Sequence, residues 1–413
     1  MIVSELLLRN FRNVSECKFV PDPKLNFLLG ENGQGKTSFL EALGFLATLR
    51  SFRGSKPDEV LKWNEATSEI RCKLQPVTPE EQAGWETDLK VVFDKSGDKS
   101  GGVIAGARPK VAKVAFINGK PFKSSTSYLS QRFGSFELGF HAVVFNPSDH
   151  DLVRGDPSTR RNYLDRVIAA ENVHFLKTVS KYQRILTQRN AVLKQEEQAG
   201  SRDLLAGFTD QLVTLGAQLA FTRLEWILKL AERLNEMVHQ IAPRQPSLRF
   251  VYLSNWAPQI DNLSLNNSDL GPVNFTGHGQ QPSLELLEQS FRKRLSQLEA
   301  AEWRSGHSLV GPHRDDWAFY LGEQALRGHG SQGEVRSALL ALKLCEIDLF
   351  RIETGHRPLF LLDDFSSELD RERRTFLLGY LSESDLQVFV TTTEDSSLHG
   401  KKFKVSNGFL LPA

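Results

Sequence analysis

Hydrophobic residues follow a strand-like pattern at both ends of the chain and a helix-like pattern in its middle. Short apolar runs broken by proline and glycine predict strands in "IVSELLLRNFRNVSECKFVP" and "KLNFLLG". The segment "KTSFLEALGFLATL", which follows, predicts a helix. From Ile70 to about Phe122, alternating pieces separated by Pro, Gly and Lys clusters predict an antiparallel sheet, with a mobile loop near "DKSGDKSGG".

The middle of the chain predicts long helices. Asp156 and Pro157 form a helix start, and one helical pattern runs from there to Lys194. A second runs from about Leu204 to Ile241, so that two helices joined by a polar turn form a helical hairpin. After a polar loop at 257–281, a candidate for disorder, "PSLELLEQSFRKRLSQLEAAEW" predicts another helix, and alternating β and α signals return after Gly306.

Composition limits the class of protein without identifying its ligand. With 51 basic and 50 acidic residues among 413, the net charge is +1, so a nucleic-acid surface would have to be a local patch. The three cysteines lie far apart, which is typical of buried thiols in a reducing compartment. The N-terminus lacks the apolar core of a signal peptide, and no apolar run approaches the roughly 18 residues of a membrane span. We therefore expect a cytoplasmic protein without a membrane partner.

The most specific motif is a phosphate-binding loop. "FLLGENGQGKTSFLEAL" places G-x-x-x-x-G-K-T between a predicted strand and a predicted helix. In such a loop, backbone N–H groups surround the β-phosphate, Lys36 reaches the β- and γ-oxygens, and Thr37 binds Mg²⁺. The motif predicts ATP and Mg²⁺ as ligands. Its candidate binding residues are Gly30, Glu31, Asn32, Gly33, Gln34, Gly35, Lys36, Thr37 and Ser38.

A second acidic motif completes the candidate catalytic set. In "RPLFLLDDFSSELD", four apolar residues precede Asp363 and Asp364. Asp363 suits the coordination shell of Mg²⁺, and Asp364 suits a base that orients the attacking water. Taken alone, the motif also describes a buried strand that ends in two solvated aspartates.

More than 300 residues separate Lys36 from Asp363. We therefore expect a discontinuous nucleotide-binding lobe, formed by residues 1–122 and 306–413, around an inserted helical hairpin lobe at 123–305.

Together these motifs resemble ABC-type ATPases of the SMC class and, within that class, the RecF family of recombination mediators. The agreement extends over nearly the whole chain, through "LLLRNFRN", "GENGQGKTSFLEAL", "LRSFRG", "FNPSDHDLVRGDPSTRRNYLD", "QRNAVLK", "GPHRDD", "GSQGEVRSALLALKL" and "LLDDFSSELD". The resemblance implies an α/β fold: an ABC-type P-loop ATPase head, with a mixed sheet, helices and an antiparallel β subdomain, carrying an α-helical hairpin insertion.

The resemblance also implies a composite site between two subunits. Ser331, Gln332 and Gly333 correspond to the ABC signature, which in this class binds the γ-phosphate held by a second copy. From the residues alone, Ser331 followed by Glu334 predicts a helix capping box. Both interpretations use the same exposed helix start.

Further residues are matched by resemblance. Ser367 to Asp370 correspond to the loop that crosses the dimer interface, and Asp370 is taken as a nucleotide-site residue. Arg12, with Asn10, matches a strand motif that contacts nucleotide. Arg50 and Arg53 are candidate nucleotide or DNA contacts, and an ordinary charged surface is the alternative.

The chain also departs from the wider ABC pattern. Asp364 stands in place of the catalytic glutamate, and Thr393 stands where many ABC proteins have a switch histidine. No Q-loop glutamine is evident, and Asn146 occupies that region. These differences predict slow ATP turnover.

A local excess of basic residues between Asp151 and Lys194 predicts the DNA surface. The alternative is a solvated helix face. The candidate contacts are Arg160, Arg161, Arg184 and Arg189.

By resemblance, ATP binding dimerises the protein on duplex or gapped DNA, and weak, DNA-stimulated hydrolysis releases it. With RecR and RecO, the protein would promote RecA loading. The alternative is an SMC-like or transport-type ABC ATPase that acts as a switch without a RecA-loading role. Stimulation of the ATPase by DNA would distinguish a DNA-bound switch from a transport ATPase.

Overall fold

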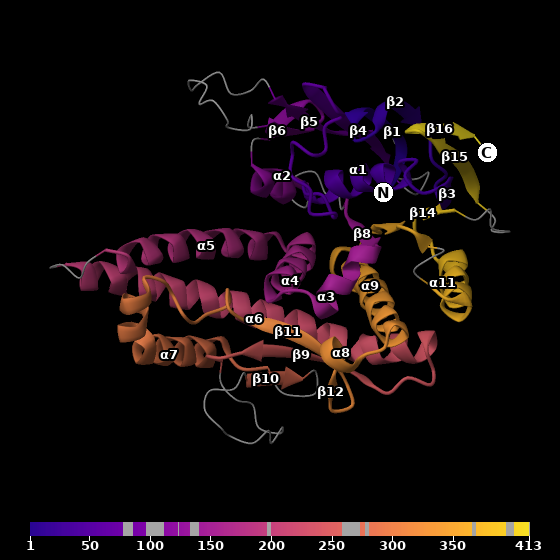
Figure 1. Cartoon of the computed structure of the whole chain (residues 1–413). Helices are drawn as coiled ribbons and strands as arrows, with labels where there is room; N and C mark the ends of the chain where they lie inside the picture. Colours follow the sequence, from indigo (N-terminus) through magenta and orange to yellow (C-terminus); the bar gives the residue numbers. More distant parts are fainter. Residues whose placement is uncertain are drawn as a thin grey trace. The chain divides into compact units, whose positions relative to one another are not determined.

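The computed structural model describes residues 1–76, 86–95, 111–122, 124–132, 140–195, 200–257, 273–276, 281–365, 369–393 and 400–412. Most of the segment "DKSGDKSGG" and most of 257–281 lie outside these ranges. Two compact units are present: Met1–Ser148 with Phe350–Ala413, and Asp149–Leu349 (Figure 1).

These units divide the chain at other positions than the predicted lobes. β8 (Ala142–Phe145) pairs in parallel with β13 (Leu359–Leu362), which keeps residues up to 148 in the first unit. β11 (Asp316–Leu321) pairs with β9 (Leu248–Ser254), which keeps the residues after 306 in the second. Pairing between strands that are far apart in the sequence sets both boundaries. The local sequence near residues 122 and 306 does not predict this pairing.

The central sheet of the first unit is mixed. Its strand order is β16-β15-β3-β14-β13-β8, and the pairs from β15 to β8 are parallel. β13 and β14 (Val388–Thr392) are buried along their whole length, as strands covered on both faces are. The other strands are β3 (Leu25–Leu29), β15 (Lys401–Ser406) and the antiparallel edge strand β16 (Phe409–Pro412).

Parallel pairing has a consequence for the candidate site. The carboxyl ends of β3, β13 and β14 lie at one edge of the sheet, where ligands bind in open α/β sheets. The phosphate-binding loop follows β3, and Asp363 follows β13.

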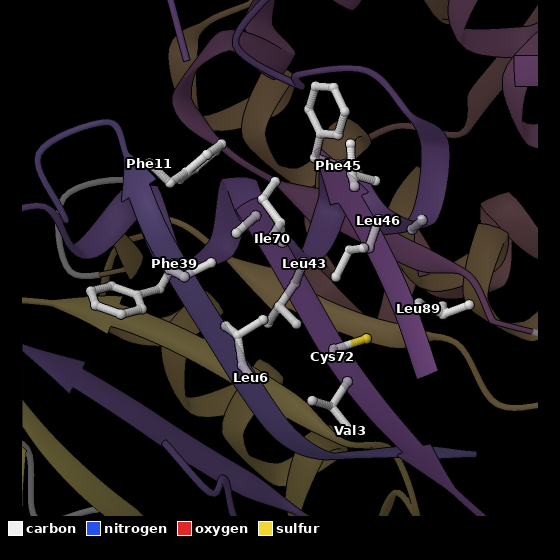
Figure 2. Close-up of a cluster of buried hydrophobic side chains, with 14 of the residues drawn as sticks. Val3, Leu6, Phe11, Phe39, Leu43, Phe45, Leu46, Ile70, Cys72 and Leu89 are labelled. Atoms are coloured by element: carbon white, nitrogen blue, oxygen red, sulfur yellow. The ribbon is translucent and has the colours of Figure 1, made fainter. Parts of the chain in front are cut away.

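A second, antiparallel sheet in the first unit has the order β2-β1-β4-β5-β6-β7. Helix α1 (Lys36–Thr48) packs its apolar side chains on this sheet, with Phe39, Leu43 and Leu46 among side chains from three strands (Figure 2). Helix α2 (Ser125–Arg132) is attached through Tyr128, whose hydroxyl donates to the carbonyl oxygen of Leu46 at 3.0 Å. The strands are β1 (Ile2–Phe11), β2 (Val14–Phe19), β4 (Thr67–Gln75), β5 (Thr87–Asp94), β6 (Ala112–Ile117) and β7 (Lys120–Phe122).

The second unit combines helices with a smaller sheet of order β10-β9-β11-β12. Its long helices α5 and α6 form the predicted hairpin and lie side by side (Figure 1). The elements are η3 (Pro147–Asp149) at its boundary, α3 (His150–Arg154), α4 (Pro157–Glu171), α5 (Val173–Leu193), α6 (Ser201–Ile241), β10 (Val273–Thr276), α7 (Leu284–Ser305), β12 (Gln324–Ala325) and α8 (Leu326–His329).

The prediction of one helix from Asp156 to Lys194 is wrong. Asn172 interrupts it, because its backbone is extended and its side-chain oxygen accepts from the backbone N–H groups of His174 and Phe175. This N-cap starts a new helix with its own direction.

Three remaining elements follow the second unit's sheet along the chain. They are α9 (Gln332–Thr354), then β13, then α11 (Arg371–Glu383). Among the described residues, no helix is both long enough and apolar enough to cross a membrane.

Candidate functional site

The phosphate-binding loop joins the carboxyl end of β3 to the amino end of α1. Gly33 and Gly35 have φ angles of 81° and 101°, a left-handed conformation that side chains with a Cβ rarely adopt. A Cβ at Gly35 would lie 2.4 Å from Nδ2 of Asn13, and one at Gly30 would lie 2.4 Å from the carbonyl oxygen of Val405. The glycines of the motif are therefore required by backbone conformation or by close packing.

Neighbouring segments brace the loop at Gln34. The side chain of Asn13 donates to the Gln34 carbonyl at 3.1 Å and accepts from the hydroxyl of Ser38 at 3.1 Å. From the turn between β15 and β16, the backbone N–H of Gly408 donates to the same carbonyl at 2.9 Å, and that of Asn407 donates to Oε1 of Gln34 at 2.7 Å. The side chains of Glu31 and Asn32 are exposed.

Lys36 lies inside the loop and is only 7% exposed. Its Nζ donates to the carbonyl oxygens of Gly30 at 2.5 Å and Glu31 at 2.9 Å. Burial lowers the pKa of Lys36 from its ordinary value, while the charges of Asp364 and Asp363 raise it. The ammonium group is therefore held by neutral carbonyl acceptors. Anionic phosphate oxygens form stronger hydrogen bonds with an ammonium group and would replace them.

Asp363 connects three elements at the carboxyl edge of the sheet. Its Oδ1 accepts from the hydroxyl of Thr37 at 2.9 Å and from the hydroxyl of Thr391, at the end of β14, at 2.8 Å. Burial raises the pKa of Asp363, and the two hydrogen bonds lower it. The predicted metal ligands Thr37 and Asp363 are thus brought into direct contact.

This donor set fits Mg²⁺. A threonine hydroxyl and an aspartate carboxylate are hard oxygen ligands, and Mg²⁺ is commonly held by one or two carboxylates together with water and phosphate oxygens. Thr37 Oγ1 and Asp363 Oδ1 lie 2.9 Å apart, where the phosphate-binding loop meets the end of β13. They would hold the ion from the protein side.

Asp364 has a φ of 54°, a left-handed conformation uncommon for a residue other than glycine. Its backbone N–H donates to the hydroxyl of Thr391 at 2.8 Å. Such backbone strain persists where the surroundings impose it, and it concentrates at functional sites. Thr391 therefore orients both aspartates, a role that the sequence pattern missed. The signal was the position of "VTTTE" at the end of a buried strand.

The structure does not favour the predicted nucleotide contact of Arg12. Its guanidinium donates to both carboxylate oxygens of Glu41, at 2.8 and 2.5 Å, to the hydroxyl of Ser55 at 2.5 Å and to the carbonyl oxygen of Glu59 at 2.6 Å. These bonds occupy most of the donors of an arginine. Asn10 binds Glu65 through its side chain at 3.1 Å.

The predicted capping box at the start of α9 is confirmed. A carboxylate oxygen of Glu334 accepts from the backbone N–H and from the hydroxyl of Ser331, both at 2.8 Å, and the N–H of Glu334 lies 3.3 Å from that hydroxyl. Ser331 and Gln332 are exposed, and Gly333 is half-buried. The start of α9, the predicted signature segment, is therefore both capped and accessible.

Asp370 begins α11 in the same manner. Its Oδ1 accepts from the backbone N–H of Arg373 at 3.0 Å, and this hydrogen bond lowers the pKa of Asp370. Residues 366–368, which include the predicted interface residue Ser367, lie outside the described residues.

The structure corrects two of the predicted DNA contacts. Arg160 is 2% exposed and binds both carboxylate oxygens of Asp316, at 2.6 and 2.7 Å. Arg189 is 1% exposed and binds Glu302 at 2.7 Å and Ser308 at 2.6 Å. Both guanidinium groups are buried in ion pairs, with the half-buried Asp316 and the buried Glu302, and are closed to phosphate. Charge counting along the chain cannot distinguish such residues from surface ones.

The other two candidates differ from each other. Arg161 is half-buried, and it donates to the carbonyl oxygen of Asp315 at 2.8 Å. Arg184 is exposed on α5, together with Lys177 and Lys181. These three share one helix face because they are spaced by three or four residues. We call them the basic stripe of α5.

Comparison with known proteins places this site in a family. The family model described as "RecF/RecN/SMC N terminal domain" matches residues 2–406. The "DNA replication and repair protein RecF" of Geobacter sulfurreducens is 32% identical over 418 residues, which cover 100% of both chains. The chain belongs to the RecF family. The RecF protein of Listeria monocytogenes is similarly 32% identical, over 99% of this chain and 97% of its own.

Solved structures support the RecF fold. The structure described as "the recombination mediator protein RecF-ATP in RecFOR pathway" matches 100% of this chain and 97% of its own, with a TM-score of 0.80 and 27% identity. An Smc head domain from Pyrococcus furiosus matches with a TM-score of 0.52 at 13% identity, which shows the common fold alone. The expected α/β ABC-type ATPase head and the resemblance to RecF are confirmed.

The RecF-like motif "GPHRDD" forms a buried polar network in the second unit. Asp315 is 1% exposed and accepts from the hydroxyl of Tyr252 at 2.7 Å and from the indole N–H of Trp256 at 3.0 Å. Arg223 binds both carboxylate oxygens of Asp165, at 2.8 and 2.9 Å. Burial raises the pKa of Asp315 to about 6.

His313 belongs to the same motif. Its Nδ1 lies 2.7 Å from the hydroxyl of Tyr182, and its Nε2 lies 3.3 Å from the carbonyl oxygen of Ser308. Burial lowers the pKa of His313 to about 4. A neutral ring satisfies both contacts, with Tyr182 donating to Nδ1 and Nε2 donating to the carbonyl.

His313 and Asp315 should change the stability of the protein with pH in opposite directions. Stability rises with pH wherever the unfolded chain binds more protons. Between pH 4 and pH 6.5, His313 binds its proton more in the unfolded chain, because its pKa is about 4 in the folded protein and 6.5 in the unfolded chain. Between pH 3.8 and pH 6, Asp315 binds its proton more in the folded protein, because its pKa is about 6 there and 3.8 in the unfolded chain. Relative to wild type, His313→Asn should therefore lose more stability at pH 6 than at pH 4.5, and Asp315→Asn should lose more at pH 4.5. Urea unfolding at pH 4.5 and pH 6 tests this. The prediction is wrong if the free energy of unfolding changes equally between these two pH values in wild type, His313→Asn and Asp315→Asn.

Proposed function

We propose that this protein is an ATP-dependent DNA-binding recombination mediator. The observation that carries the proposal is the contact between Thr37 and Asp363, which joins the phosphate-binding loop to the end of β13 in a RecF-family chain. Lys36 would bind the β- and γ-phosphate oxygens, and Thr37 and Asp363 would hold Mg²⁺. The bound ion would neutralise charge on the phosphates as the terminal bond breaks.

Hydrolysis would be slow. Asp364 would orient the attacking water, and the hydrogen bond from its backbone N–H to Thr391 holds the left-handed backbone from which the carboxylate extends. Its side chain is one methylene shorter than the glutamate of most ABC ATPases. A base that lies farther from the attacking water accepts the proton of that water less effectively. ATP binding, more than turnover, would set the state of the protein.

ATP would join two copies. In this arrangement the phosphate-binding loop of one copy meets Ser331, Gln332 and Gly333 of the other, with the exposed start of α9 facing the γ-phosphate. Helix starts favour anions through their free N–H groups and dipole. Asp370 would lie near the interface between the copies.

The ATP-bound dimer would hold duplex or gapped DNA. The basic stripe of α5 offers three exposed cations for phosphate contacts, which are independent of sequence and sensitive to salt. The name of the RecF relatives refers to DNA replication and repair, and that of the solved relative to the RecFOR pathway. On this basis we propose RecR, RecO and RecA as partners, stimulation of the ATPase by DNA and a cytoplasmic location.

Sedimentation with and without ATP and DNA tests the proposal, and Asp364→Asn sharpens it. Removal of the charge should block hydrolysis and leave binding intact, so the variant should persist as an ATP dimer on gapped duplex DNA. ADP serves as the control and should leave monomer. If Asp364→Asn with ATP and DNA sediments only as free monomer, the proposal is wrong.

A further inference from the structure

The β-hairpin formed by β15 and β16 exposes apolar side chains (Figure 1). Among the described residues, seven large hydrophobic side chains are exposed, and three of them, Val20, Phe409 and Leu411, lie at this hairpin. Single exposed hydrophobic residues are ordinary, whereas a group of them marks an interaction surface. Phe409 is 57% exposed and Leu411 is 56% exposed. They lie two positions apart on one strand, so their side chains point to the same side of the sheet.

The strand register places lysines beside these apolar residues. Lys404 pairs with Leu411, and Ser406 pairs with Phe409, so Lys404 points to the same side of the sheet as the two apolar side chains. Lys402 lies two residues before Lys404 on the same strand and shares its side. We call Lys402, Lys404, Phe409 and Leu411 the β15–β16 face.

The charge of this hairpin has one sign. Residues 401–412 contain three lysines and no acidic residue. Lys401 connects the hairpin to Val20, because its Nζ donates to the carbonyl oxygen of Val20 at 2.8 Å. The surface thus combines exposed apolar side chains on β16 with ammonium groups on β15. Its charge is complementary to that of an acidic segment.

The outer edge of β16 is closed to the addition of another strand. Ser406 and Phe409 flank a two-residue turn and form a hydrogen-bonded pair, so the backbone N–H of Leu410 points away from β15. This N–H donates to the sulfur of Cys17. Pro412, the next residue whose backbone nitrogen points outward, has no N–H. A partner must therefore be recognised by the side chains of the face.

The hairpin is already ordered by its turn. Asn407 and Gly408 have φ angles of 50° and 78°, as the two central residues of a type I′ turn do. Their backbone N–H groups donate to Oε1 and to the carbonyl oxygen of Gln34. Binding at the face would therefore require little ordering of the backbone, which lowers its entropic cost.

We propose that the β15–β16 face binds an acidic segment of a partner protein that carries apolar side chains. Phe409 and Leu411 pack against the apolar side chains of the segment, and Lys404 and Lys402 pair with its carboxylates. A second copy of this chain is disfavoured, because two such faces would bring lysines against lysines. DNA would contact the lysines through its phosphates and would leave the two apolar residues without a partner. The proposal does not depend on ATP hydrolysis.

A fluorescein-labelled peptide of repeated Asp-Asp-Leu-Phe units is the probe, and fluorescence anisotropy measures its binding to the full chain. Phe409→Ser and Leu411→Ser should each raise the Kd of the peptide at least about tenfold, the factor for one buried apolar side chain. Lys404→Glu should raise the Kd about fivefold, and added salt should weaken binding to wild type.

The chain offers matched controls for both kinds of substitution. Ile352→Ser removes a side chain that is also 57% exposed but lies on α9. Lys120→Glu reverses an exposed charge on β7. Both variants should bind the peptide as wild type does. Thermal midpoints within about 2 °C of wild type would confirm that all variants fold.

The proposal is overturned if wild type does not bind the peptide, or if Phe409→Ser and Leu411→Ser bind it as wild type does. Equal affinity for a peptide with Lys in place of Asp also overturns it. Binding to phosphatidylserine vesicles, or self-association that Leu411→Ser abolishes, without binding of the peptide would assign the face to a membrane or to a second copy instead. Absence of ATP turnover in wild type would refute the proposed function and leave this inference intact.

Discussion

Lys36→Arg is expected to abolish ATP hydrolysis while some ATP binding remains. Lys36 lies 7% exposed between the carbonyl oxygens of Gly30 and Glu31. A compact ammonium fits this space and donates toward the β- and γ-oxygens, whereas the planar guanidinium is larger and donates in a fixed fork. The positive charge still attracts phosphate, but its donors no longer point at the transferring group. The loss in kcat should be at least about a hundredfold.

Phosphate release measures the loss in Lys36→Arg, and titration with a fluorescent ATP analogue measures the binding that remains. Lys24→Arg is the matched control, because Lys24 is exposed at the opposite end of β3 and should show wild-type turnover. Normal hydrolysis by Lys36→Arg would refute the assignment of the phosphate-binding loop as the catalytic site.

Ser331→Arg is expected to prevent the ATP-dependent dimer while nucleotide binding stays intact. The nucleotide-binding loop belongs to the first unit and Ser331 to the second, so the substitution leaves the loop unaltered. In the dimer, a long side chain at the exposed start of α9 would occupy the space of the γ-phosphate. It would also break the capping box, which costs about 1 kcal/mol.

Ser331→Ala separates these two effects. It loses the cap hydroxyl, which bonds with Glu334, but adds no bulk. We expect Ser331→Ala to dimerise with ATP, at reduced affinity, and Ser331→Arg to remain monomeric in sedimentation velocity. An ATP-dependent dimer of Ser331→Arg would show that the signature serine does not act across two copies.

Local patterns predicted the features that depend on neighbouring residues. The glycines of the phosphate-binding loop, the capping box at Ser331 and the buried strand before Asp363 each depend on backbone conformation or alternation within a few residues. Such preferences act before tertiary contacts form. The break at Asn172 also has a local cause, an N-cap, but the continuous apolar pattern around it concealed the break.

The sequence by itself thus determined the strand–loop–helix motif, the acidic strand end and the family. Only the tertiary structure decided which charged groups are buried in ion pairs and which are exposed. Arg160 and Arg189 pair with carboxylates more than a hundred residues away, so their burial leaves Arg184 as the exposed candidate for DNA. The buried carboxylate of Glu41 is neutralised because the turn after β1 and the loop after α1 bring Arg12 and Arg53 to it. The energy of a charge depends on its burial and on its partner, and folding alone supplies both.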